Sequence, residues 1–142
     1  MNDDFLPLYI NFMRQLTGSW SSKYFRTKAN TAYAKGDGVY SDATDIVTTT
    51  TTTPTFLGIV DETKASANNN NRIKVLVPSS KRCTFSVAAT AATAAYEGRR
   101  VDFSSATAVD ISATTYKAVS IVKFISATEL EVWANDGIAL YL

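Results

Sequence analysis

The chain contains no histidine, a single cysteine and only three prolines among its 142 residues. Without histidine it lacks the commonest general base of enzymes and the commonest transition-metal ligand. The lone Cys83 excludes an internal disulfide and a cluster of metal-bound thiolates. No apolar run reaches the roughly 18 residues that a membrane-spanning helix needs. We therefore expect no metal site, no cofactor and no membrane partner, and most enzyme classes are disfavoured.

The chain also lacks an excess of charge of either sign. Lys and Arg number 14 and Asp and Glu number 13, which leaves a formal net charge of +1. Such a balance produces no broad electrostatic field that would hold nucleic acid or an anionic lipid surface. The short basic groups at Arg72 and Lys74 and at Arg99 and Arg100 are isolated from one another. We expect no nucleic-acid partner.

Threonine and alanine dominate the composition, while the helix-forming residues Leu, Glu and Lys are scarce, which favours an all-β fold in one domain. Residues 56–60 are almost continuously apolar, as in a strand buried on both faces, and residues 72–77 alternate between apolar and polar. Residues 118–125 and 129–134 predict a hairpin in which Leu130 and Val132 face inward. About eight short strands in a small barrel or sandwich are expected.

Four local features refine this picture. Gly58 in the middle of an apolar strand predicts a bulge or a close backbone approach. Cys83 shares its alternation with Phe85 and is predicted to be buried on the apolar face. Residues 68–71, all asparagine, favour a loop. Residues 88–95 fit either one helical turn or a strand of small residues, and periodicity does not separate the two.

The first thirty residues differ from the rest and divide the chain into an N-terminal docking arm, residues 1–30, and a β-domain, residues 31–142. The spacing of apolar residues up to Leu16 allows a short helix that ends at Gly18. The arm either packs back on its own domain or docks on a neighbouring protein. Large apolar side chains dominate interface energetics. The candidate partner contacts in the arm are Phe5, Leu6, Leu8, Tyr9, Phe12, Trp20 and Tyr24.

Candidate catalytic groups are few. Glu129 and Glu131 lie on one face of a predicted strand, about 7 Å apart by the strand rise, which is compatible with paired-carboxylate glycoside chemistry. An exposed hairpin with alternating charges gives the same pattern and is the favoured interpretation. The spacing of Asp37, Asp42 and Asp45 matches no calcium loop. We predict that the protein is not an enzyme.

The order of several short motifs resembles that of tailed-phage capsid decoration proteins, also called cement or head-stabilising proteins. These motifs are Ala32-Tyr-Ala-Lys-Gly-Asp-Gly-Val-Tyr40, then Phe56-Leu-Gly-Ile-Val60, and later Tyr96-Glu-Gly-Arg-Arg-Val-Asp-Phe103 before a terminal hairpin. The resemblance covers residues 32–134 and leaves out the N-terminal arm.

The resemblance implies a structural protein of the virion, located on the outer surface of an icosahedral capsid. It would bind the major capsid protein, bridge its subunits, and form a homo-oligomer, with a trimer favoured. Trp133 joins the arm residues as an expected partner contact. The alternative is another virion or surface β-module, such as a tail or fibre component or a carbohydrate-binding domain, in which Trp133, Tyr96 and the asparagine block would contact the ligand.

Overall fold

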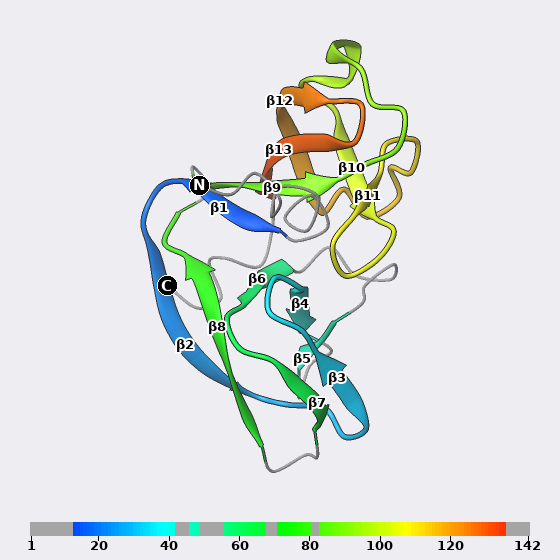
Figure 1. Cartoon of the computed structure of the whole chain (residues 1–142). Helices are drawn as coiled ribbons and strands as arrows, with labels where there is room; N and C mark the ends of the chain where they lie inside the picture. The colour runs from blue at the N-terminus through cyan, green and yellow to red at the C-terminus, as the bar shows by residue number, and fades with distance from the viewer. Residues whose placement is uncertain (1–12, 42–45, 49–55, 68–70, 81–82, 136–142) are drawn as a thin grey trace, which may run out of the picture.

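The fold is a sandwich of antiparallel β-sheets. A computed structural model describes residues 13–41, 46–48, 56–67, 71–80 and 83–135. Within them thirteen strands form sheets of six, five and two strands, and the arrangement is sandwich-like, not a closed barrel (Figure 1). The all-β prediction is confirmed. There are more strands than the eight expected. Two of them, β5 (Ile46–Val47) and β11 (Val109–Asp110), are only two residues long, and such short strands leave no period-two pattern in the sequence.

The six-stranded sheet occupies the upper part of Figure 1 and has the order β1-β9-β13-β12-β10-β11. Its remaining strands are β1 (Arg14–Thr17), β9 (Thr84–Ala88), β10 (Arg100–Phe103), β12 (Val119–Ser126) and β13 (Glu129–Ala134). The predicted terminal hairpin is present as β12 and β13, which pair from Val119↔Ala134 to Ser126↔Glu129. Leu130 and Val132 are buried as expected.

The five-stranded sheet below it has the order β2-β8-β6-β4-β5. It contains β2 (Trp20–Arg26), β4 (Gly38–Ser41), β6 (Phe56–Val60) and β8 (Arg72–Pro78). A separate pair, β3 (Thr31–Tyr33) and β7 (Lys64–Ala67), forms the two-stranded sheet. The structure thus confirms both strands that the apolar patterns of residues 56–60 and 72–77 predicted.

Aromatic rings fill the space between the two large sheets. Phe56 of β6 stacks on Phe85 of β9, with ring centroids 4.8 Å apart, and on Phe103 of β10, at 5.6 Å. The Tyr40 ring meets Phe56 and Phe103 edge-on. Such stacked and edge-to-face pairs add to the stabilisation that burial of the rings already provides. This cluster connects the sheets and is the larger of the two cores.

The second core lies on the other face of the five-stranded sheet. Its members come from β3, β4, β5, β6 and β8, and Phe25 of β2 packs against it; they are Tyr33, Val39, Ile46, Leu57, Val60, Ile73, Val75 and Val77. Strand β6 is therefore buried on both faces, which is why its residues are apolar without alternation.

The N-terminal segment differs most from its prediction. Arg14–Thr17 is a strand and not part of a helix, because its backbone pairs with β9 at the edge of the six-stranded sheet. Trp20–Arg26 pairs along its whole length with β8. The predicted boundary at residue 30 therefore does not separate an arm from a domain, because residues 14–26 supply an edge strand to each of the two large sheets. Residues 1–12 lie outside the described residues.

The open question at residues 88–95 is also resolved. Strand β9 ends at Ala88, and a 3₁₀ turn, η2 (Ala94–Tyr96), follows with Thr93 at its N-cap. The asparagines at 68–70 and residues 136–142 lie outside the described residues.

Replacement of Gly58 by alanine should strongly destabilise the protein. A Cβ at this position would lie 2.3 Å from the backbone oxygen of Leu76, so β6 and β8 would have to separate. We expect G58A to lower the free energy of unfolding by about 2–3 kcal/mol in chemical denaturation.

Gly98→Ala is the control, because Gly98 has open space around it but a φ of +90°. Its cost should be about 1 kcal/mol, from backbone conformation alone. Equal stabilities of G58A and the native protein would contradict the close approach of these strands.

Candidate functional site

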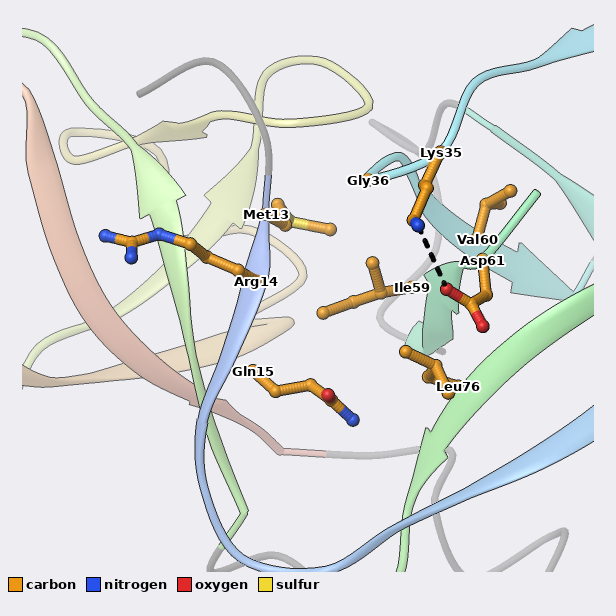
Figure 2. Close-up of a pocket in the computed structure, with 9 residues that line it drawn as sticks. All are labelled: Met13, Arg14, Gln15, Lys35, Gly36, Ile59, Val60, Asp61 and Leu76. Carbon is orange, nitrogen blue, oxygen red and sulfur yellow. Dashed lines mark ion pairs between the residues drawn. The ribbon is translucent and has the colours of Figure 1, made fainter. Parts of the chain in front are cut away.

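A cleft of about 420 Å³ opens between the two large sheets on the side of β1 (Figure 2). Met13, Ile59 and Leu76 point toward one another across it from the start of β1, from β6 and from β8. Met13 and Ile59 are almost fully buried and belong to the main core. The floor of the cleft is therefore apolar and continuous with the core, and the other lining residues are Arg14, Gln15, Lys35, Gly36, Val60 and Asp61.

The turn at residues 34–38 forms one wall of this cleft through backbone hydrogen bonds. Gly36 accepts a hydrogen bond from the N–H of Met13 (3.1 Å) and donates its own to Val60 (2.9 Å). Asp37 accepts the N–H of Val60 through its backbone oxygen (2.8 Å). The turn thereby joins β1 to β6, so the cleft is a fixed part of the framework.

Charged groups surround the mouth of the cleft. Asp61 lies between two lysines, with Lys74 Nζ at 3.4 Å and Lys35 Nζ at 3.9 Å from its carboxylate. The Lys35 side chain is 71% exposed, whereas that of Asp61 is 22% exposed. Arg14 points away from the cleft (Figure 2). Its guanidinium nitrogen lies 2.8 Å from the carboxylate of Glu129. The most accessible charge at the mouth is therefore the ammonium group of Lys35.

Asp37 is the titratable group whose environment is most unusual near the cleft. Burial raises the pKa of its carboxyl group, although a hydrogen bond from the N–H of Ala34 opposes this change. Its Oδ2 lies 2.9 Å from that nitrogen. Burial, and next the charge of Asp37, raise the pKa of the Tyr40 phenol. Asp37 belongs to the turn and Tyr40 to β4, and neither side chain lines the cleft.

Of the predicted partner contacts, Tyr24 and Trp20 lie on β2. Tyr24 is 63% exposed and is paired in the ladder with Lys74, on the sheet face that also carries Leu76. Trp20 instead packs edge-on against Phe85, and its indole N–H donates to the oxygen of Thr17. The structure thus presents Tyr24 near the cleft and uses Trp20 mainly to join β2 to the main core.

Trp133 faces away from the main core. It projects from β13 on the outer face of the six-stranded sheet, opposite Ser120 of β12, and is 37% exposed. Tyr96 packs against the main core, and the guanidinium of Arg99 covers its ring at 4.4 Å. Phe5, Leu6, Leu8, Tyr9 and Phe12 lie outside the described residues.

The two glutamates weighed as catalytic groups project from β13 on the same outer face. Glu129 accepts a hydrogen bond from Arg14, so its charge is neutralised by a specific partner. Glu131 is opposite Ser86 of β9 and Lys123 of β12. The Glu129 side chain is only 13% exposed, so this glutamate is a covered ion-pair partner and not one of a row of freely exposed charges.

Cys83 is buried, as its alternation predicted. Its thiol donates a hydrogen bond to the backbone oxygen of Ser19 at 3.1 Å, close to Gly18, where the chain passes from β1 to β2.

No group of three or more His, Cys, Asp or Glu side chains in the described ranges could hold a metal ion. In the same ranges, no helix is long and apolar enough to cross a bilayer.

A feature that the sequence reasoning missed is a set of exposed apolar residues at β-bulges. Leu16 is the extra residue where Gln15 and Thr17 pair with Phe85 and Thr84. On β12, Val122 and Ile125 are also extra residues, because each lies between two residues that pair with consecutive residues of β13. A bulge redirects the side chain of its extra residue. These three side chains are 36%, 38% and 40% exposed.

No protein-family model matches the chain, and a search of curated proteins finds no match to it. The geometry described above is therefore the main guide to function.

The raised pKa of Asp37 predicts a specific dependence of stability on pH. A carboxyl group with a higher pKa in the folded state binds its proton more tightly there, so its ionisation opposes folding at neutral pH. That cost should disappear as the pH falls through the folded-state pKa toward the ordinary value. D37N, which cannot ionise but can still accept the Ala34 N–H, should be more stable than the native protein at pH 7.

The measurement is the difference in free energy of unfolding between D37N and the native protein from pH 7 to pH 3. The advantage of D37N should shrink on acidification. A difference that stays constant with pH, or a D37N variant that is less stable at pH 7, would contradict the burial of this charge.

Proposed function

We propose that the protein is a structural component of a virion that binds the outer surface of an assembled icosahedral capsid. It stabilises the shell by bridging subunits of the major capsid protein, acts as a homo-oligomer, with a trimer favoured, and performs no covalent chemistry. The order of the motifs between residues 32 and 134 first suggested this role. The presentation of Tyr24 is the structural observation that best supports it.

Tyr24 is a large side chain with most of its surface in solvent, yet its backbone is held rigidly. All seven residues of β2 pair with β8, and β8 is anchored in the second core through Ile73, Val75 and Val77. A tyrosine fixed in this way loses little conformational entropy when a partner covers it.

A repeating lattice suits a binding surface of this modest size. Each copy needs to contribute only a few kcal/mol, because contacts to two shell subunits at once, repeated over many copies, combine through avidity. Binding that occurs only on the assembled lattice stabilises the lattice by mass action. The near-neutral net charge limits repulsion between closely spaced copies.

A second candidate is a carbohydrate-binding module, and the position of Trp133 favours it. This ring lies on an outer sheet face beside the hydroxyl of Ser120, and an exposed aromatic ring next to hydroxyl groups can stack on a sugar. Binding to a glycan array that is lost in W133A would support this candidate over the capsid role.

The test of the capsid role is co-sedimentation with purified, undecorated shells of the phage whose genome encodes the chain. The native protein should sediment with assembled shells and not bind unassembled major capsid protein. Y24A should weaken binding about tenfold, since buried aromatic contacts dominate interfaces. Because Tyr24 is largely exposed, the thermal unfolding temperature of Y24A should equal that of the native protein.

Ala32→Ser supplies the control, because Ala32 is exposed on the separate two-stranded sheet. Deletion of residues 1–12 tests the predicted contacts Phe5, Leu6, Leu8, Tyr9 and Phe12 and leaves β1 and β2 in place. Failure of the native protein to bind assembled shells would refute the proposal, and full binding by both Y24A and the deletion variant would refute the assigned surface.

A further inference from the structure

Val122 and Ile125 are exposed apolar side chains at the two bulges of β12, hereafter the β12 knob. The two bulges that expose them lie only three residues apart in the chain. Two consecutive register shifts in one strand are a feature of the backbone itself, so the exposure of these side chains is built into the fold.

The β12 knob lies along the part of the strand that β10 does not reach. The pairing of β12 with β10 covers only Val119 and Ser120, and Ile121 then exchanges hydrogen bonds with Gly98 and Arg99. Beyond Ile121, no strand of the described chain pairs with β12 on that side. The Phe124 N–H is instead satisfied by the carboxylate of Glu97 at 2.8 Å. The knob is thus accessible, and an exposed carboxylate lies beside it.

The cleft beside β1 has complementary properties. Its floor is apolar at Met13, Ile59 and Leu76, and its most accessible charge is the ammonium of Lys35. Asp61 is closer to Lys74 than to Lys35, which leaves the charge of Lys35 only weakly compensated. An apolar group accompanied by a carboxylate fits this cleft in both polarity and charge.

The knob cannot enter the cleft of its own chain. Strands β9 and β13 separate β12 from β1 in the six-stranded sheet, which places the two features about 14 Å apart at normal strand spacing. Only the knob of another copy could reach the cleft.

We propose that the cleft beside β1 binds the β12 knob of a second copy, with Val122 and Ile125 against the apolar floor and Glu97 near Lys35. The two contact surfaces differ, so the interface is heterologous and propagates head to tail until a ring closes. This inference rests on the homo-oligomer in the proposed function and supplies its contact surfaces.

Two single substitutions in the full chain each disable one surface. Gln15→Trp places a bulky ring at the mouth of the cleft, where Gln15 is exposed, and leaves the knob intact. Ile125→Asp places a charge on the exposed knob and leaves the cleft intact. Ala32→Trp and Ala32→Asp are the matched controls on the two-stranded sheet. Circular dichroism and thermal unfolding verify that each variant is folded.

The readout is molar mass by sedimentation velocity in the absence of capsids. The native protein and both Ala32 variants should form a closed oligomer, while Q15W and I125D should each be monomeric. An equimolar mixture of Q15W and I125D should form a heterodimer and nothing larger, because the mixture contains only one competent cleft and one competent knob per pair. Lys35→Glu should weaken native self-association about fivefold at low salt.

A monomeric native protein would overturn the inference, as would oligomeric Q15W or I125D. A mixture that stays monomeric, or an association that K35E leaves unchanged, would also overturn it. Capsid co-sedimentation of the native protein is a separate readout, so shell binding by a monomer would refute this interface while supporting the proposed function. An oligomer that does not bind shells would support this interface and refute the proposed function.

Discussion

The passage of the chain from β1 to β2 is the constraint on which the rest of the molecule depends. At Gly18 the backbone turns with a φ of +88°, and a Cβ there would lie 2.5 Å from the sulfur of Cys83. Only glycine can make this turn so close to β9. On either side of it, one strand completes the edge of the six-stranded sheet and the next completes the edge of the five-stranded sheet. The passage ties the two layers together at one side and leaves the cleft between them.

The two cores explain why this side is rigid enough to serve as a binding surface. The stacked rings of Phe56, Phe85 and Phe103 hold the large sheets together, and the second core supports the opposite face of β6 and β8. Strand β2, which carries Tyr24, is an exposed edge strand that is anchored through Trp20 to the main core and through Phe25 to the second core. A protein that acts by adhesion benefits from this rigidity, because little conformational entropy is lost on binding.

Patterns of period two could be predicted from the sequence, and they correspond to strands whose burial alternates or is complete. The hairpin of β12 and β13, the alternation in β8 and the close approach at Gly58 all follow from local residue types. The helix allowed before Gly18 was wrong for residues 14–16. Leu16 continues the helical spacing of the apolar residues before it, but the pairing of this segment with the distant strand β9 makes it a strand.

The cleft and the bulges could not be located in the same way, because they depend on contacts between segments far apart in the chain. One signal was nevertheless present in β12. Val119 and Ile121 follow one alternation, whereas Phe124 packs inward in the opposite phase, and this change requires an extra residue between them. The assignment of Trp20 as a partner contact shows the same limit, since only the three-dimensional structure reveals its packing on Phe85.

Adhesion through the β1 and β2 side is the central claim, and cryo-electron microscopy of phage shells incubated with the protein tests it most directly. The account predicts density for the β-sandwich on the outside of the shell, with Tyr24 facing the shell subunits. Shells that carry no added density, or a sandwich whose Trp133 face lies against the shell, would contradict it.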